Sequence, residues 1–441
     1  MASIHRVGLA AAMDAEARSG KRLVIGVVGA GEMGVDLAVQ LSLMSGVALG
    51  AISEIRPQAA RDAALTSGRD DGDIVAAASA SAIDRAIESG KVALTDDYVT
   101  LCAAGRIDVI IDATGSPNVG ALVALEAIKN GKHIVMVNVE ADITIGRFLK
   151  AEAKKAGVVY TGAAGDEPAA TIELIGFAQA LGFEIVAAGK GKNNALQFDA
   201  TPDQFAEEAR RRDMNPRMLV EFVDGSKTMV EMTAVANATG LKPDIPGMHG
   251  PNATRDELPH VLCAKEDGGI LDHSGVVDYT LGEDVAPGVF CVVKPRHPRV
   301  IERLADLRVG RGPCFALIRP YHLTSIEVPL SAVRAARDRV VDIAPIDEPV
   351  AECVALAKRD LQPTQTLGKI GEYDYRGFTM AWSDARKARA LPLGLAERSR
   401  PLRPIKAGEF LTYENCAPDD SLAVTQIRRR LDQADARFAP V

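Results

Sequence analysis

Short apolar runs alternate with longer amphipathic stretches over the first 180 residues of the chain. The runs are rich in Val, Ile and Ala, which is typical of strands buried on both faces of a parallel sheet. They lie at residues 23–28, 47–52, 92–95, 108–113, 133–138 and 158–161. Apolar residues recur at helical spacing over residues 35–43, 76–88, 120–130, 145–156 and 169–181. This alternation predicts an α/β fold with a Rossmann-type, doubly wound parallel sheet, preceded by an amphipathic helix within residues 1–21.

Three glycines follow the first apolar run at the spacing G-x-G-x-x-G. Gly29 permits a tight turn, Gly31 lets the backbone approach a pyrophosphate, and Gly34 lets the helix pack closely on the strand. The pyrophosphate would lie at the start of the helix, beside Glu32 and Met33, where free N–H groups favour an anion. A glycine-rich turn of another α/β protein is the alternative. The strand before and the helix after the glycines favour a dinucleotide.

The second predicted strand ends at Ser53, Glu54 and Arg56. An acid about 20 residues past the last glycine usually binds the ribose hydroxyls of NAD, whereas an arginine nearby can hold the 2′-phosphate of NADP. These residues therefore leave NAD and NADP both open. The third interpretation is a solvated turn in which none of the three touches a cofactor.

Polar residues also follow two later strands of the predicted sheet. Thr114 and Gly115 follow the strand at 108–113, and Asn138 ends the strand at 133–138. Because ligands bind at the carboxyl ends of strands in such sheets, we expect these three residues to contact the cofactor. Glu140 and Asp142 are expected in the loop after Asn138. The loop at 162–168 is expected to be flexible and acidic.

A second concentration of chemistry lies in the sequence Gly189-Lys190-Gly191-Lys192-Asn193-Asn194. Lys190 and Lys192 share one face if the strand predicted at 184–188 continues. With Asn193 and Asn194 they would form a site for an anion or a carbonyl, where a lysine binds phosphate or passes a proton to an alkoxide. A solvated lysine hairpin is the alternative. The flanking glycines favour a backbone pressed against a neighbour.

Several carboxylates lie near predicted strand ends or helix breakers. They are Glu140, Asp166, Glu167 and Glu231. Such oxygen ligands suit Mg²⁺ or Mn²⁺, although a surface role is equally compatible with each of them.

Three further groups of polar residues have a less specific pattern. His273 and His322 lie in polar loops and are candidates for proton transfer, whereas His133, at a strand entry, is interpreted as structural. Arg210 to Arg212 are interpreted as the solvated end of a helix at 205–212.

The length of 441 residues indicates more than one domain. We predict an NADP-binding domain at 1–165, a substrate and dimerisation domain at 166–345, and a β-rich domain at 346–441 that ends in a charged helix. A helix near 326–337 is expected to return to the first domain. Because closed two-fold dimers are the commonest soluble assembly, we expect a homodimer.

The overall charge and the cysteines bear on partners and location. The net charge of −8 argues against nucleic acid or an anionic membrane as a partner. The six cysteines are scattered without zinc-type spacing, which indicates reduced thiols and a cytoplasmic protein. No apolar run approaches the length of a membrane span or a secretory signal.

Several longer motifs carry a resemblance that covers nearly the whole chain. They are LVIGVVGAGEMG, IIDATGSP, HIVMVNVEAD, GDEPAA, GKGKNN, DYTLG, APGVF and RPYHL. With these motifs the chain resembles the homoserine-dehydrogenase-like oxidoreductases that end in a SAF-type domain. One subgroup of them resembles deoxyxylulose-phosphate reductoisomerase.

That resemblance implies a specific reaction. The implied enzyme converts 1-deoxy-D-xylulose 5-phosphate to 2-C-methyl-D-erythritol 4-phosphate with NADPH and a divalent metal, and is inhibited by fosmidomycin. Lys190 and Lys192 would then hold the phosphate or the oxyanion, Asn193 and Asn194 would orient it, and Glu231 or Asp166 would hold the metal. Homoserine dehydrogenases carry a lysine in an A-N-K motif where this chain has Asn138, Val139 and Glu140, so homoserine oxidation is disfavoured. Two alternatives are a dehydrogenase of a hydroxy acid or sugar acid, and a regulator that senses a nucleotide.

Overall fold

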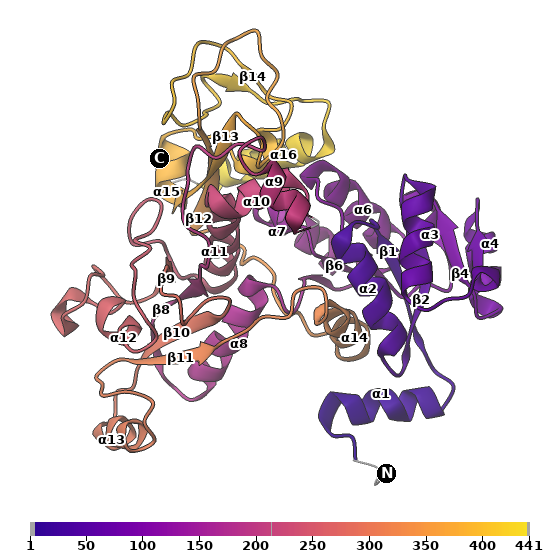
Figure 1. Cartoon of the computed structure of the whole chain (residues 1–441), viewed down its shortest axis with the longest axis horizontal. Helices are drawn as coiled ribbons and strands as arrows, with labels where there is room; N and C mark the ends of the chain where they lie inside the picture. The colour runs from indigo at the N-terminus through magenta and orange to yellow at the C-terminus, as the bar shows by residue number, and fades with distance from the viewer. Residues whose placement is uncertain (1–4, 213, 439–441) are drawn as a thin grey trace. The chain divides into compact units, whose positions relative to one another are not determined.

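The computed structural model describes residues 5–212 and 214–438, which divide into two compact units (Figure 1). Unit 1 contains the chain up to Asn138, together with Arg147–Asp166 and Leu323–Ala344. Unit 2 contains Val139–Gly146, Glu167–His322 and the chain from Pro345 onward. The segment from Pro345 onward, which contains the domain that we predicted at 346–441, thus groups with 167–322.

Unit 1 is built on a seven-stranded parallel sheet in the order β3-β4-β2-β1-β5-β6-β7. Its strands are β1 (Leu23–Val28), β2 (Val47–Ser53), β3 (Ile74–Ala76), β4 (Val92–Thr95), β5 (Val109–Asp112), β6 (His133–Met136) and β7 (Tyr160–Gly162). Its helices include α1 (Gly8–Arg18), α2 (Glu32–Leu43), α3 (Pro57–Thr66), α4 (Ala80–Glu88), α5 (Tyr98–Ala103) and α6 (Pro117–Lys129). The predicted Rossmann-type sheet is confirmed. The strand order reverses between β1 and β5, which is where such sheets bind their ligands.

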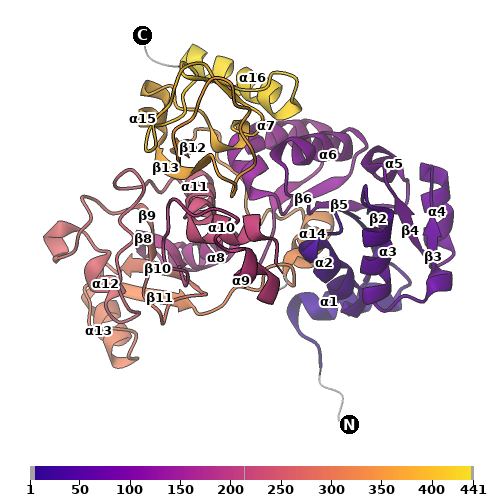
Figure 2. The same ribbon diagram turned by 45° about the horizontal axis from the view of Figure 1, so that its top comes forward.

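Helix α14 (Val328–Asp338) belongs to unit 1, although about 165 residues separate it from β7 (Tyr160–Gly162) in the sequence. Its side chains Val328, Ala332 and Val333 are buried in the same core as Ile25 and Val135 of the central strands. The helix contacts β6, β5 and β7 (Figure 2). Burial of one apolar helical face therefore fixes this late segment on the first sheet.

Unit 2 contains a four-stranded sheet in the order β11-β10-β8-β9. The strands are β8 (Glu184–Gly191), β9 (Val276–Thr280), β10 (Val289–Lys294) and β11 (Phe315–Arg319). Helices α8 (Glu167–Ala180) and α11 (Ser226–Thr239) contact each other and the strands β8, β9 and β10 (Figure 1). Shorter helices are α9 (Ala206–Arg211), α10 (Pro216–Val223), α12 (Leu258–Val261) and α13 (Pro298–Asp306).

The C-terminal part of unit 2 is rich in short strands, as predicted. The strands are β12 (Ala351–Ala357), β13 (Tyr375–Ala381), β14 (Arg400–Pro401) and β15 (Cys416–Ala417), with helices α15 (Trp382–Lys387) and α16 (Ala423–Phe438). Helix α11 packs against β12 and β13. The contact includes buried polar pairs, such as the Thr233 and Thr379 hydroxyls at 2.9 Å and the Asn237 side chain that accepts from the Val350 N–H at 2.9 Å. These satisfied groups fix the register of the β-rich part on the helix.

Two local predictions are wrong. Helix α7 (Val139–Ala156) begins six residues before the predicted start, so Glu140 and Asp142 lie in its first turn, where the helix dipole favours acids, and not in a loop. The loop predicted at 162–168 to be flexible is buried throughout, and α8 already begins at Glu167.

The cysteines and the longest helices bear on the remaining expectations. All six cysteines are free and buried. No helix within residues 5–212 and 214–438 combines the length and the apolarity needed to cross a membrane.

Candidate functional site

The three glycines after β1 have different structural roles. Gly29 has φ +100°, which a side chain would strain, and its N–H donates to the Ser53 carbonyl at 2.8 Å. A Cβ on Gly34 would lie 2.1 Å from the Gly29 carbonyl oxygen, so only glycine allows this packing. A Cβ on Gly31 would meet no atom within 4 Å. The chain therefore closes tightly at Gly29 and Gly34 and leaves open space at Gly31.

The open space lies directly before α2. Gly31 is the N-cap residue and no side chain caps the helix, while Glu32 is exposed and Met33 is half-buried in the first turn. Uncapped N–H groups next to open space fit the pyrophosphate of a dinucleotide. The predicted phosphate cradle is thus compatible with the local geometry.

Glu54, at the end of β2, holds the glycine loop in place. Its carboxylate accepts from the Ala30 N–H at 2.9 Å and from the Arg56 N–H and Nε at 3.1 and 2.9 Å. Burial alone would raise the pKa of Glu54, but these hydrogen bonds and the charge of Arg56 together lower it. Glu54 is therefore anionic at neutral pH, and the exposed Arg56 guanidinium lies beside it.

The loop after β5 borders the glycine loop, because a Cβ on Gly29 would meet the Ala113 carbonyl at 2.8 Å. Asp112 accepts from the Thr114 N–H at 3.0 Å and from the Thr114 hydroxyl at 2.6 Å. Burial raises the pKa of Asp112 to about 6 against the effect of these bonds. Asn138 is buried and donates to the Ser116 carbonyl at 2.8 Å, which orders the same loop. Thr114 and the exposed Gly115 therefore sit where β1 and β5 end.

Lys190 is the centre of a buried charge cluster in unit 2. Strand β8 extends through Lys190 to Gly191, further than predicted. The Lys190 ammonium is 2.5 Å from Glu167 Oε1, at the start of α8, and 2.5 Å from Glu231 Oε2, in the middle of α11. The two carboxylates outweigh the desolvation that opposes them and raise the pKa of Lys190, so the lysine is a firmly charged ammonium.

The glycines on either side of Lys190 allow β8 to approach neighbouring backbone closely. A Cβ on Gly189 would lie 1.6 Å from the Asp278 carbonyl oxygen of β9, and one on Gly191 would lie 2.4 Å from the Ala286 nitrogen. The predicted close approach of backbone is confirmed, and its partner is other backbone of unit 2. The lysine is thereby fixed from both sides.

Lys192 has a different environment from Lys190. It is buried and donates to the Phe222 carbonyl at 2.6 Å. Asn193 is exposed and Asn194 is half-buried, with the Asn194 amide donating to the Asn193 side chain at 3.2 Å. Both lysines are buried in unit 2, but β8 ends at Gly191, before Lys192, and the asparagines bond to each other at its edge.

The titration of Lys192 gives a first test. Burial, and then repulsion from Lys190, lowers the pKa of Lys192 to about 8. Between pH 8 and about 10.5 the unfolded chain binds more protons at this group, so stability should rise with pH in that window. The free energy of unfolding of the wild type should rise by a few kcal/mol between pH 7 and about 10.5 because of this group, and Lys192→Met should lack that rise. Denaturant unfolding across this pH range measures it. If stability rose equally with pH in both proteins, Lys192 would not be a buried amine without a counter-charge.

The carboxylates do not support the predicted metal site at Glu231. Glu231 and Glu167 already share the Lys190 ammonium, whose charge occupies the place that a cation would take between them. Burial raises the pKa of Glu231, and the charge of Glu167 adds to this effect. Asp166 is buried at the end of its segment of unit 1. We therefore assign no step to a metal.

The candidate histidines lie in different surroundings. His322 lies beside the Lys190 cluster, with Nε2 3.5 Å from Glu167 Oε1. His273 is instead half-exposed, 3.6 Å from Asp244. His133 accepts from the Val159 N–H at 3.0 Å, which confirms its structural role.

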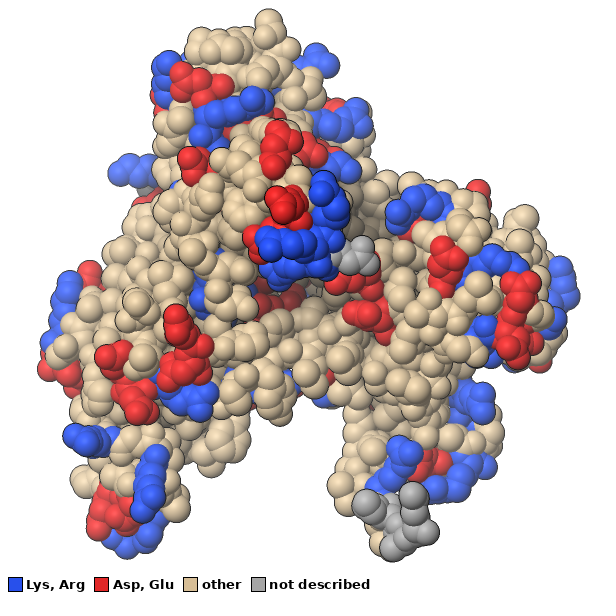
Figure 3. Space-filling view, in the orientation of Figure 1, with Lys and Arg blue, Asp and Glu red and all other residues tan. Residues whose placement is uncertain are grey.

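Glu140 and the three arginines lie elsewhere in unit 2. Glu140 is 3.4 Å from Lys227 of α11, an ion pair that the sequence did not indicate because it joins α7 and α11. The arginines 210 to 212 lie exposed at the end of α9, as predicted (Figure 3).

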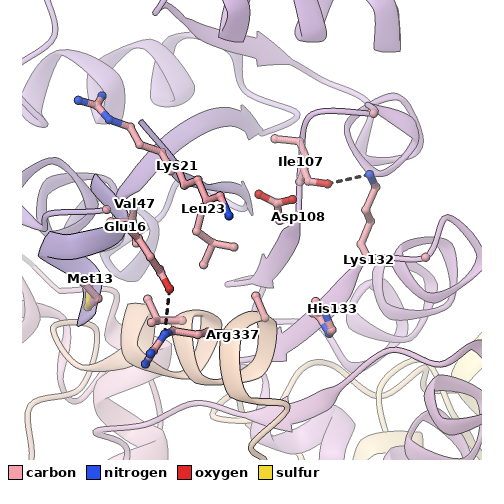
Figure 4. A pocket seen from close by; sticks show the side chains of 16 residues that line it. Met13, Glu16, Lys21, Leu23, Val47, Ile107, Asp108, Lys132, His133 and Arg337 are labelled. Carbon is pink, nitrogen blue, oxygen red and sulfur yellow. Dashed lines mark hydrogen bonds and ion pairs between the residues drawn. The ribbon is translucent and has the colours of Figure 1, made fainter. Parts of the chain in front are cut away.

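Unit 1 has a cavity of about 550 Å³ at the amino ends of its strands (Figure 4). It is lined by the residues that begin β1, β2 and β6 and precede β5, namely Leu23, Val47, His133 and Asp108. Two of its cations are engaged: Arg337 pairs with Glu16 at 2.9 Å, and Lys132 donates to the Ile107 carbonyl at 2.7 Å. This cavity is at the opposite end of the strands from the glycine loop.

Two family models match adjoining parts of the chain. Residues 58–161 match the model described as "Homoserine dehydrogenase, NAD binding domain", and residues 165–328 match "Oxidoreductase DRL, catalytic domain". A comparison with curated proteins gave no match.

Solved structures show weaker likenesses. A probable dehydrogenase from Thermotoga maritima is 13% identical over 73% of this chain and 91% of that chain, with a TM-score of 0.44. A putative myo-inositol dehydrogenase from Sinorhizobium meliloti 1021 is 13% identical over 74% and 92%, with a TM-score of 0.40. These likenesses are too weak to carry an assignment.

The matches and the geometry agree on the class of protein. The NAD-binding model covers the later part of the unit 1 sheet, and the catalytic model covers the segment that holds Glu167, Lys190 and Glu231. The chain is therefore an oxidoreductase with a Rossmann-type unit for a nicotinamide cofactor, and its two matched parts are similar to the NAD-binding domain of homoserine dehydrogenase and to the catalytic domain of the DRL oxidoreductase.

Proposed function

We propose that this oxidoreductase is an NAD(P)-dependent dehydrogenase that interconverts a hydroxyl and a carbonyl group of a small hydroxy acid or sugar acid. The observation that carries the proposal is the buried Lys190 ammonium between two carboxylates. An ammonium has three N–H donors, and Glu167 and Glu231 each accept one. The third is available for a substrate oxygen, because no other partner lies within bonding distance among the described residues.

The chemistry follows from the charges of the cluster. The bound nicotinamide supplies or accepts the hydride. Lys190 donates a proton to the oxygen of a carbonyl that is reduced, and takes it back in the other direction. Glu231 accepts from the Lys190 ammonium as a carboxylate, so a proton from solvent restores the ammonium after each transfer. Glu167 holds the ammonium in place from the other side.

A reductoisomerase of deoxyxylulose phosphate is the second candidate. The match to a DRL catalytic domain over residues 165–328 favours it over homoserine oxidation. The A-N-K motif of homoserine dehydrogenases has its lysine where this chain has Glu140, which pairs with Lys227. The lack of that lysine also argues against homoserine oxidation. In this reading, Lys190 would protonate the aldehyde oxygen during the reductive half of the reaction, the substrate would be a phosphorylated sugar, and the C-terminal part would be a SAF-type domain.

A substrate panel separates these functions. Purified protein would be mixed with NADPH or NADH and with 1-deoxy-D-xylulose 5-phosphate, and with NADP or NAD and with homoserine, hydroxy acids and sugar acids, while nicotinamide absorbance is followed. Oxidation of a hydroxy acid or sugar acid supports the dehydrogenase. Turnover of deoxyxylulose phosphate that fosmidomycin suppresses supports the reductoisomerase instead. Tight nucleotide binding without turnover of any substrate would leave a nucleotide-sensing regulator.

We further propose NADP(H) as the cofactor, because Arg56 neutralises Glu54 and exposes a guanidinium beside it. We expect Arg56→Ala to weaken NADPH binding about tenfold or more and to leave NADH binding nearly unchanged, since only NADPH carries a 2′-phosphate. Titration of both reduced cofactors into both proteins measures this. An equal loss for NADH would mean that Arg56 acts on the loop alone.

A further inference from the structure

Arg376, on β13, is a buried cation without a counter-ion. Its exposed fraction is 9%. Its one hydrogen bond is a long one, from Nη1 to the Gly377 carbonyl at 3.3 Å, and no carboxylate among the described residues pairs with it. Burial accordingly lowers the pKa of Arg376. A buried charge left unpaired is costly, so proteins retain one mainly where a ligand completes it.

Three other buried cations of unit 2 have carboxylate partners, whereas Lys192 bonds to a carbonyl and, like Arg376, lacks one among the described residues. Lys190 has Glu167 and Glu231, Lys358 has Asp224 at 3.1 Å, and Arg428 has Glu352 and Asp432. The negative charge of Asp224 opposes the lowering of the Arg376 pKa. However, the Asp224 carboxylate accepts its hydrogen bonds from Lys358 and from the Ser226 N–H, not from Arg376. Apart from the long bond to the Gly377 carbonyl, the N–H donors of Arg376 thus have no acceptor among the described residues.

Two aromatic rings hold the guanidinium in position. Its carbon lies 4.2 Å from the centroid of Phe198 and 5.6 Å from that of Phe378. Stacking on ring faces fixes the plane of the guanidinium and keeps its edge N–H groups free for a carboxylate or a phosphate. Phe198 is 47% exposed, so the ring side of this pair borders solvent.

Helix α11 joins this group to the Lys190 cluster. Near its start, the Ser226 hydroxyl accepts from the Gly377 N–H, next to Arg376, at 2.9 Å. Five residues later Glu231 accepts from Lys190. At 1.5 Å per residue these contacts are about 7.5 Å apart along the helix. Tyr279, on β9, is paired in register with Lys190 on β8. The backbone next to Arg376 and the Lys190 side chain therefore both bond to the first half of α11.

We propose that Arg376 binds the anionic group of the substrate, a carboxylate or a phosphate, while Lys190 engages the reacting oxygen. This inference rests on the proposed function and deepens it, because it names the substrate class and gives the C-terminal β-rich part a role in specificity. Neutral hydroxy compounds of the same size bind weakly, since they leave Arg376 unpaired.

The first test is independent of turnover. Inorganic phosphate and malonate would be titrated into the full-length protein and into Arg376→Gln, with binding followed by calorimetry. We expect either anion or both to bind the wild type, and Arg376→Gln to weaken that binding by on the order of 100-fold. Preference for phosphate or for malonate identifies the class of substrate anion. Equal binding by both proteins, or no binding by the wild type, would overturn the proposal.

Arg359→Gln is the matched control. Arg359 also lies over an aromatic ring, that of Tyr373 at 5.9 Å, but it is half-exposed and paired with Asp374 at 2.6 Å. We expect this variant to bind the anions like the wild type. A loss equal to that of Arg376→Gln would show a nonspecific effect of charge.

Ligand-free stability separates binding from a structural role. Because Arg376 is unpaired, Arg376→Gln should unfold at an equal or higher temperature than the wild type without anions. A clear fall in Tm would mean that Arg376 is a structural residue.

For whichever substrate proves active, Arg376→Gln should raise KM about 100-fold with little change in kcat, and should not affect a neutral analogue. Anion binding without turnover of any substrate would refute the proposed function and leave the anion site standing.

Discussion

Replacement of Lys190 by Met is expected to lower kcat by on the order of 10³, because a positioned proton donor contributes about 10²–10⁴ to the rate. Affinity for the nicotinamide cofactor should not change, since Lys190 belongs to unit 2 and the glycine loop to unit 1. Steady-state kinetics with the active substrate and separate cofactor titrations measure the two effects. Unchanged kcat would show that the reaction takes place elsewhere.

The same substitution should also destabilise the protein. Without the ammonium, the carboxylates of Glu167 and Glu231 remain buried together, which costs roughly 3–5 kcal/mol. The double variant Lys190→Met/Glu231→Gln removes one of these charges and should regain most of the stability without regaining turnover. Activity that returned with stability would mean that Lys190 only supports the fold. Lys190→Arg, which keeps the charge but scarcely releases a proton, should fold and remain slow.

Gly31→Ala and Gly34→Ala should fail in different ways. A Cβ at position 34 would lie 2.1 Å from the Gly29 carbonyl oxygen, so Gly34→Ala should lower Tm by several degrees and abolish cofactor binding with the loss of the loop. At position 31 the same atom meets nothing within 4 Å. Gly31→Ala should therefore keep the stability of the wild type.

Cofactor affinity distinguishes the two glycines. If the open space at Gly31 receives the pyrophosphate, Gly31→Ala should weaken nucleotide binding by about tenfold or more while the fold is intact. Differential scanning calorimetry and cofactor titration of the two variants give the comparison. Wild-type affinity in Gly31→Ala would place the pyrophosphate elsewhere. Equal Tm values in both variants would contradict the packing at Gly34.

The pattern of apolar residues was sufficient to predict the ends of strands that are buried on both faces. The strands at 23–28 and 92–95 have the predicted ends, because a two-sided apolar run needs no knowledge of its neighbours. Pattern failed where a polar residue is buried by a partner from another element. Glu140 and Glu167 seemed to be loop residues, and both lie in first helical turns whose acids pair with Lys227 and Lys190.

The amino-acid sequence by itself determined the Rossmann-type sheet, the glycine turn and the choice of Lys190 as a candidate site residue, because these depend on periodicity and on residues adjacent in the chain. Only the tertiary structure decided which groups surround that lysine, since Glu167 and Glu231 are 23 and 41 residues away from Lys190. It also decided that Arg376 is buried without a counter-ion. Burial and charge pairing are properties of packed elements, and no spacing along one strand or helix specifies them.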